Sequence, residues 1–444
     1  MRFGALFRSV LLYLSLAATA FGEQPKMIRE FKRAALVEVS RDGRWILTSS
    51  FREIECLHGQ QHCFSDVLTV YDNANRKPTG EILLRKPSQR GIPNRFLSPE
   101  FTDAPSVRAI ESTWDDQQRG NAYAILRWDP ILKSEERRAV TFPKDFWYKC
   151  FVDDTSLLGV AGKLFSPPYT YIKRNGQEYV NPNDPVNRLR HREIWPLEVV
   201  TPGSPPRTVG ALTDPPLASI AYGHPWTAWR LRDSFLLEDT ESDDGHFGKS
   251  LSWFTPQSGA APRLCHSFGD ERIRGYALSP DRSRIAVITT RKGDPQDRAY
   301  LNVLAAASCA QLNRFELEFP EKPQTRSPLL APSVKYLDNI PFPDQFARSV
   351  AISPDNALLA VAYGIKKRSS GLAFFGVYSM LGGRRLATLK GDTFTPNLYD
   401  TFMLDMYSAR EAPLAGNLQF SADSKSLYTS SWRIREWDVS GLRN

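Results

Sequence analysis

The sequence lacks the local signatures of the common enzyme classes. It contains no G-x-S-x-G, G-x-x-x-x-G-K-[ST], H-E-x-x-H or G-x-G-x-x-G motif, which argues against a nucleophile elbow, a phosphate loop, a zinc helix or a dinucleotide turn. Its 444 residues include only six histidines. Four of them, His191, His224, His246 and His266, lie in predicted loops or strand ends, where surface or capping roles are expected. We therefore predict a protein that is not an enzyme and carries no cofactor or metal.

Long apolar runs are also missing beyond the N-terminus, which argues against an integral membrane segment in the mature chain. At the N-terminus, two arginines precede the apolar run Val10–Ala20, and Ala20-Phe21-Gly22 matches a small-x-small cleavage site. Ala18-Thr19-Ala20 is a competing site, and an uncleaved anchor is the alternative. These features predict a signal peptide at residues 1–22 and a secreted or periplasmic protein.

Neither sign of charge dominates the chain. The formal charge is +8, and removing residues 1–22 takes away two arginines and no acid, which leaves +6. Such a mild balance is typical of a mixed-charge solvated surface. Export makes nucleic acid an improbable partner, so we expect a monomer that binds a protein or an anionic envelope polymer. The absence of an Asn-x-Ser/Thr sequon leaves N-glycosylation without a site.

Cysteine is scarce, with five residues in the chain. The segment from Cys56 to Cys63 begins and ends with a thiol and holds two histidines, but its spacing is unlike a zinc finger or ribbon. In an oxidising compartment a Cys56–Cys63 disulfide is the better interpretation. A second bridge between Cys265 and Cys309 stays open, and Cys150 is the candidate for a buried free thiol.

What the sequence does contain is a recurring phrase. An apolar residue is followed by Ser-x-Asp, a turn and an apolar strand. We expect a strand to end there, Ser and Asp to bond back to the backbone, and an antiparallel strand to follow. The phrase occurs at Val39–Asp42, Leu278–Asp281, Ile352–Asp355 and Phe420–Asp423.

A second marker recurs about every 61 residues and gives roughly seven units. It is an aromatic residue, often followed by Asp, that closes a later strand. We assign it to Tyr71, Trp128, Trp195, Trp253, Tyr378 and Trp437, with Leu304 in the one unit that lacks an aromatic residue.

The last unit, LQFSADSKSLYTSSWRIREWDVSG, resembles the WD-repeat β-propeller family. The chain departs from that family because no Gly-His dipeptide opens its repeats and the turn before Arg433 lacks the usual Asp. Bacterial propellers with loose SPDG-type repeats fit equally well. The resemblance implies an all-β propeller, here with seven blades of four antiparallel strands.

We predict a single propeller domain over residues 23–444. The seventh unit ends without an outer strand, and Met27–Lys32 precedes the first unit. This N-terminal segment is therefore expected to supply the missing strand and close the ring, with Ile28 and Phe31 buried against the strand that carries Ile434 and Trp437.

Three insertions exceed a typical blade: Ser166–His191, Glu321–Gln345 and Gly391–Gly416, the last with a predicted short helix at Tyr399–Arg410. Long loops of a propeller project from one rim, where partners bind. The acidic stretch Glu238–Gly245, around Asp239, departs from an EF-hand and is interpreted as a solvated turn in preference to a calcium site.

The predicted function is an exported, non-catalytic interaction module or scaffold that binds a protein or an envelope component through its loop-rich face. The alternative is a propeller enzyme, lactonase-like or a metal-dependent hydrolase, with a site at the central channel. Apolar residues on the first strands, such as Ala277 and Ala351, argue against that alternative.

Overall fold

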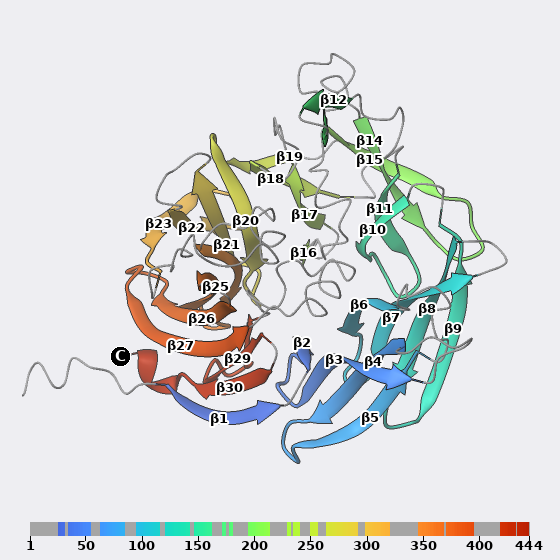
Figure 1. Cartoon of the computed structure of the whole chain (residues 1–444), viewed down its shortest axis with the longest axis horizontal. Coiled ribbons are helices and arrows are strands. Elements are labelled where there is room, and N and C mark those ends of the chain that lie inside the picture. The colour runs from blue at the N-terminus through green and yellow to red at the C-terminus, as the bar shows by residue number, and fades with distance from the viewer. Residues whose placement is uncertain are drawn as a thin grey trace, which may run out of the picture.

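The computed structural model describes residues 25–31, 34–54, 63–84, 95–115, 120–142, 146–161, 171–174, 177–180, 194–213, 229–231, 234–239, 249–255, 263–291, 298–319, 345–367, 370–394, 418–431 and 433–443. In these ranges the strands form seven four-stranded antiparallel sheets and one separate two-stranded hairpin. The sheets follow one another around a ring (Figure 1). The predicted all-β propeller with four-stranded antiparallel sheets is confirmed.

The sheets are numbered here in chain order. Sheet 1 consists of β2 (Ala35–Val39), β3 (Trp45–Ile54), β4 (Cys63–Asp72) and β5 (Lys77–Leu83). Sheet 2 consists of β6 (Arg95–Phe101), β7 (Val107–Asp115), β8 (Gly120–Asp129) and β9 (Ser134–Val140). Sheet 3 consists of β10 (Phe146–Phe151), β11 (Leu157–Ala161), β14 (Ile194–Val200) and β15 (Arg207–Thr213). Sheet 4 consists of β16 (Trp229–Leu231), β17 (Ser234–Asp239), β18 (Ser250–Phe254) and β19 (Arg263–Ser267).

Sheet 5 consists of β20 (Glu271–Leu278), β21 (Arg284–Arg291), β22 (Ala299–Ala305) and β23 (Gln311–Leu317). Sheet 6 consists of β24 (Gln345–Ile352), β25 (Leu358–Lys367), β26 (Ser370–Ser379) and β27 (Arg385–Phe394). Sheet 7 combines β28 (Leu418–Phe420), β29 (Ser426–Ser430) and β30 (Ile434–Asp438) with β1 (Lys26–Phe31). The separate hairpin is β12 (Tyr171–Arg174) with β13 (Gln177–Val180), and a short 3-10 helix, η3 (Ser440–Arg443), ends the described chain.

The Ser-x-Asp phrase makes the same turn each time, between the first and second strands of a sheet. In sheet 6, the hydroxyl of Ser353 donates to Asp355 at 2.6 Å and accepts the backbone N–H of Leu358 at 2.9 Å. The backbone N–H of Ser353 also donates to the carbonyl of Leu358 at 3.0 Å. Equivalent serine–aspartate bonds occur at Ser40, Ser279 and Ser421, which confirms the predicted turn.

The hydrophobic core lies between neighbouring sheets. One cluster joins sheets 5 and 6 through side chains such as Ile288 and Tyr363, and another joins sheets 6 and 7 through Phe375 and Leu427. These four side chains, and Leu68 in the cluster between sheets 1 and 2, each expose no more than 1% of their surface. Each sheet is thus stabilised mainly by the apolar faces of its neighbours.

The marker residue lies on the third strand, one residue before the strand ends, in six of the seven sheets, with Leu304 in place of an aromatic residue in sheet 5. Sheet 3 is the exception. Trp195 lies at the start of β14, and its partner is Leu212. In sheet 3, the residue one place before the end of the third strand is Val199. It pairs with Leu158 of the second strand, as Tyr378 pairs with Leu359 in sheet 6. The assignment of Trp195 as a marker is therefore wrong, because a β-branched valine, 7% exposed, fills the same strand position.

Strand β1 supplies the outer strand of sheet 7. It pairs antiparallel with β30, from Lys26 opposite Asp438 to Phe31 opposite Ile434. Phe31 packs on Tyr71 of sheet 1. The expected burial of Ile28 is wrong, since the register shifts at this residue and 43% of its surface is exposed.

The two rims of the ring differ in the length of their connections. Because the sheets are antiparallel, the first-to-second and third-to-fourth connections leave from one rim, called here the turn rim. None of them spans more than eight residues. The opposite rim, called here the long-connection rim, carries the four longest connections, 162–193, 214–228, 318–344 and 395–417. All three predicted insertions fall there, although Gln345 begins β24 and residues 391–394 end β27. The predicted helix at Tyr399–Arg410 lies outside the described residues.

Candidate functional site

A cleft of about 490 Å³ opens on the turn rim, where sheets 2 and 3 meet. Its first wall is the end of β6 and the turn that follows, and its second wall is the turn between β10 and β11. Arg108, at the start of β7, lies between them. The lining residues are Phe101, Thr102, Asp103, Arg108, Asp153 and Asp154.

Arg108 ties the two walls together. Its Nε donates to Glu100 at 2.6 Å, and its Nη1 donates to the carbonyl oxygen of Asp153 at 2.8 Å. The guanidinium also lies 4.4 Å above the centre of the Phe151 ring, a cation–π contact. Asp154 takes a further contact from Nη1 at 3.3 Å. Only 11% of the Arg108 side chain is exposed, so these contacts are largely shielded from water.

In sheet 3, the turn that carries Asp153 takes the place of the Ser-x-Asp phrase between the first and second strands. The Asp153 carboxylate accepts the backbone N–H groups of Thr155 at 2.8 Å and Ser156 at 2.7 Å. Desolvation raises the pKa of Asp153, but these bonds outweigh it, so the pKa is lowered overall. The cleft therefore keeps an ionised carboxylate at this position down to acidic pH.

Behind the cleft, carboxylate and amide side chains join neighbouring sheets at equivalent positions. Glu38 precedes the last residue of β2, and its Oε2 accepts the backbone N–H of Phe101 in sheet 2 at 2.7 Å. Gln419 precedes the last residue of β28, and its Oε1 accepts the backbone N–H of Val39 in sheet 1 at 2.7 Å. Its Nε2 donates to the Val39 carbonyl oxygen at 2.8 Å.

Glu38 has a strongly altered acidity. Desolvation raises its pKa to about 7, and the negative charge of Glu100 adds to the rise. The N–H of Phe101 and the charge of Arg108 act in the opposite direction but do not cancel it. Glu38 therefore changes its charge near neutral pH.

Chemically, the cleft presents three carboxylates beside one guanidinium that is already neutralised by Glu100 and Asp154. Arg127 adds a second contact to Asp154. Such a surface favours a ligand group that donates hydrogen bonds or carries positive charge. In the part of the chain that the structure describes, no group of three or more His, Cys, Asp or Glu side chains is placed to hold a metal ion.

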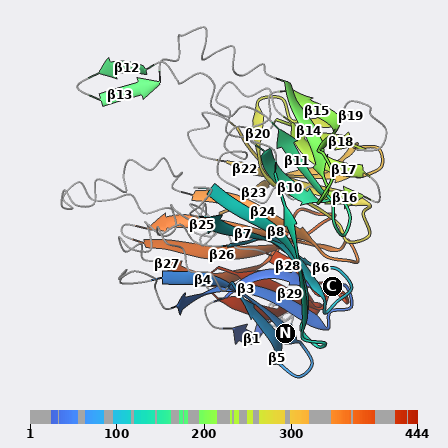
Figure 2. The ribbon, with the colours of Figure 1, turned by 90° about the vertical axis from the view of Figure 1, so that its right-hand side faces the viewer.

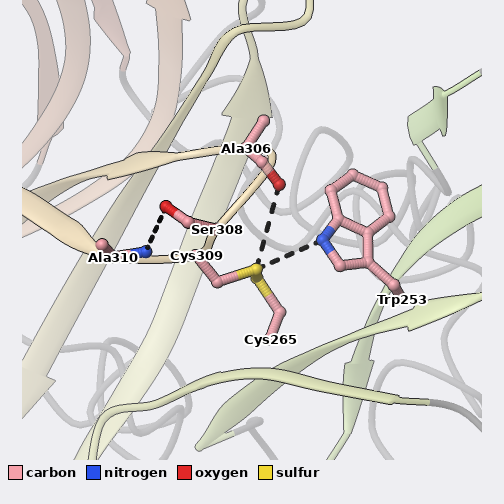
Figure 3. Close-up of a disulfide and its surroundings, with 6 residues drawn as sticks. All are labelled: Trp253, Cys265, Ala306, Ser308, Cys309 and Ala310. Atoms are coloured by element: carbon pink, nitrogen blue, oxygen red, sulfur yellow. Dashed lines mark hydrogen bonds between the residues drawn. A yellow bond between two sulfur atoms is a disulfide. The ribbon is translucent and has the colours of Figure 1, made fainter.

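Cys265 of β19 and Cys309 form a disulfide that joins sheets 4 and 5, with a Cα–Cα distance of 5.2 Å. The indole of Trp253 points at this bridge, and its Nε1 donates to the Sγ of Cys309 at 3.2 Å (Figure 3). The sequence left this pair open. The predicted Cys56–Cys63 bridge lies outside the described residues, as does the side chain of Cys150.

The remaining sequence candidates do not join the cleft. His266 of β19 packs edge-to-face against Phe268, whereas His191, His224 and His246 lie outside the described residues. In the acidic stretch, Glu238 and Asp239 end β17, and the rest lies outside the described residues. Within the residues that the structure describes, no helix is long and apolar enough to cross a membrane.

The sequence interpretation missed Glu38, Glu100 and Arg108. It took Ala277 and Ala351 as typical of the first strands, but Glu38, Glu100 and Gln419 hold the equivalent positions in other sheets. Aligning the strand ends would have shown a polar residue one place before the last strand residue in four sheets, Arg230 of sheet 4 being the fourth. That alignment was the available signal.

Comparison with known proteins identifies neither a matching family model nor a curated relative. Solved structures resemble the chain in fold. An oligogalacturonate lyase in complex with manganese aligns over 94% of this chain and 97% of its own, with 11% identity and a TM-score of 0.50. The Swd1 β-propeller domain of Myceliophteria thermophila Cps50 aligns over 94% and 99% of the two chains, with 10% identity and a TM-score of 0.41. Hydrazine synthase of Kuenenia stuttgartiensis aligns over 92% and 95%, with 11% identity and a TM-score of 0.40. At these identities the likeness concerns the fold alone.

Proposed function

We propose that the protein is an exported, non-catalytic interaction module, a ring of seven blades that binds a protein or an envelope component through its long-connection rim. The observation that supports this proposal is the asymmetry of the two rims. All four connections of fifteen or more residues leave from one rim, whereas the other rim is made of short turns.

The β12–β13 hairpin belongs to the longest of these connections. It pairs only with itself and stands away from the sheets (Figure 2). An element that pairs with none of the seven sheets adds little to their stability, but it extends the surface of this rim. The disulfide between Cys265 and Cys309 suits an oxidising compartment and so supports export.

The test replaces residues 162–193 by a short Gly-Ser linker. Strands β11 and β14 are direct antiparallel neighbours, so a hairpin loop can join them. The mature protein should capture its partner from envelope extracts, and the linker variant should lose that capture while keeping its thermal unfolding transition. Leu381→Ser, on the turn rim, is the matched control. Unchanged capture by the linker variant, or lost capture by the control, would contradict the proposal.

A propeller enzyme is the second candidate, and Glu38 is the observation in its favour. A carboxyl group with a pKa of about 7 suits general acid–base catalysis. However, Phe101 occupies its Oε2, and Glu38 does not line the cleft. Turnover of a hydrolysable or uronate substrate panel that disappears in Glu38→Gln would support the enzyme over the interaction module.

A further inference from the structure

The inner strands of the ring have backbone N–H groups that no strand of their own sheet accepts. At two successive seams these groups are held by side chains from the preceding sheet. Gln419 of sheet 7 holds the N–H of Val39, and Glu38 of sheet 1 holds the N–H of Phe101. Val39 and Phe101 are each the last residue of an inner strand. The two seams are therefore versions of one joint, one closed by an amide and the other by a carboxyl group.

The two joints differ in how they respond to protons. The amide of Gln419 does not titrate, so its joint has the same charge at every pH. The carboxyl group of Glu38 does titrate, and it is held between sheets next to another acid, Glu100. The charged groups that act on it are Glu100 on β6 and Arg108 on β7, while its pair partner on β3 is the apolar Leu47.

We propose that the seam between sheets 1 and 2 is a pH-responsive joint, in which Glu38 keeps the seam closed when protonated and loosens it when ionised. Loosening lets water reach the carboxylate and reduces its repulsion by Glu100. Phe101 lines the turn-rim cleft and Arg108 spans it, so this seam also sets the position of one cleft wall. The joint is thus a device by which external pH alters the cleft, whichever partner the ring binds.

The direction of the pH effect follows from the coupling between protonation of Glu38 and closure of the seam. Desolvation raises the pKa of Glu38 from its ordinary value of 4.5 to about 7 in the closed seam. The closed form therefore binds a proton more tightly than a form in which water surrounds the carboxyl group. Closure is fully favoured below about pH 4.5, weakens as the pH rises through 7, and changes little above that. The largest effect is about 10²-fold in the opening equilibrium.

The backbone N–H of Val39, which is held by the non-titrating Gln419, serves as an internal reference for hydrogen exchange. Hydrogen exchange of the mature protein between pH 5 and 8.5 compares the backbone N–H of Phe101 with that of Val39, after correction for intrinsic exchange rates. We expect the protection of Phe101 relative to Val39 to fall by 10-fold or more as the pH rises. A constant ratio in the wild-type protein would overturn the proposal.

Two substitutions assign the effect. Glu38→Gln copies the amide joint and should make the ratio independent of pH. Gln419→Glu copies the carboxyl joint and should make the protection of Val39 fall with pH as well. A pH-dependent ratio that survives Glu38→Gln would place the titrating group elsewhere and overturn the proposal, even if Gln419→Glu does not fold.

Discussion

At the scale of single residues, the Ser-x-Asp turns depend on one backbone conformation. The residue after the aspartate has a positive φ in each of them: +71° at Gly43, +62° at Arg282, +56° at Asn356 and +58° at Ser424. Glycine and asparagine adopt this conformation readily, whereas a long side chain meets a steric penalty. The four turns therefore share the same serine–aspartate bond but differ in backbone strain.

Arg282→Gly should raise the free energy of unfolding by about 0.5–1 kcal/mol, because it removes the penalty of a left-handed arginine. The reverse change, Gly43→Ala, should lower it by about 1 kcal/mol. The nearest atoms to a Cβ added at Gly43 are 4.0 Å away, so that loss reports conformation and not a clash. Thermal unfolding of both variants checks the pair, and equal signs would contradict it.

Asp281 shows how the same turn depends on pH. Desolvation raises its pKa, but bonds from Ser279, Ser283 and Asn356 outweigh that effect and lower the pKa to about 2. A lowered pKa contributes stability above the unfolded value of 3.8, and the contribution is lost as the pH falls from about 4 to 2.

Asp281→Asn should therefore melt at a lower temperature than the wild-type protein at pH 7 but at nearly the same temperature at pH 2. Because the side chain is exposed, the difference at pH 7 should stay below about 1 kcal/mol. A gap that is equally wide at pH 2 and pH 7 would show that the carboxylate charge is not involved.

At the scale of elements, sheets 4 and 7 have the shortest inner strands of the described four-stranded sheets. Their inner strands, β16 and β28, have three residues each. Sheet 7 gains its fourth strand from the N-terminus, whereas sheet 4 is tied to sheet 5 by the Cys265–Cys309 disulfide. We therefore expect this covalent bridge to add stability to sheet 4, whose short inner strand makes few hydrogen bonds.

Replacing both Cys265 and Cys309 by alanine should cost about 4 kcal/mol, the loop-closure value for a separation of 44 residues. Trp253 is a local reporter, because its indole donates to the bridge. Its fluorescence should change in the double variant and, equally, in reduced wild-type protein. A double variant with wild-type unfolding and unchanged fluorescence would refute the role of the bridge.

Sequence periodicity predicts the elements well where a turn needs particular side chains. Ser279 and Asp281 allow their turn to be predicted, because few other residue pairs make these hydrogen bonds to each other and to the backbone of the turn. Trp195 failed as a marker because a buried strand position accepts many apolar residues, Val199 among them. The cleft could not be predicted at all from local patterns, since Arg108 and Asp153 meet across two sheets and 45 positions of sequence.

At the scale of the whole molecule, the ends of the chain are joined by charge as well as by strand pairing. Arg29 of β1 forms an ion pair with Glu436 at 3.0 Å, and both side chains are about nine-tenths buried. On the neighbouring position, Glu30 accepts from Arg435 at 2.9 Å. The sequence predicted the partner segment from the missing outer strand, but it could not show these ion pairs.

Removing residues 23–31 should lower the free energy of unfolding by more than about 3 kcal/mol, because the protein would lose the Arg29–Glu436 ion pair and β30 would become an open edge. The shortened protein should also associate at higher concentration. Removing only residues 23–25, which leaves β1 intact, is the control. Thermal unfolding and light scattering that match the control would mean that β1 does not stabilise the ring.

The pairing of β1 with β30 also sets an order of events. The ribosome makes β1 first and β30 last, and more than four hundred residues separate Phe31 from its partner Ile434. A growing or translocating chain can form its middle sheets as they emerge, but its first strand has no partner until nearly the whole sequence is present. A chain broken off early keeps an unpaired β1 and an unfinished ring. Completion of sheet 7 therefore distinguishes full-length molecules from fragments, and proteases that attack open edges can act on that difference.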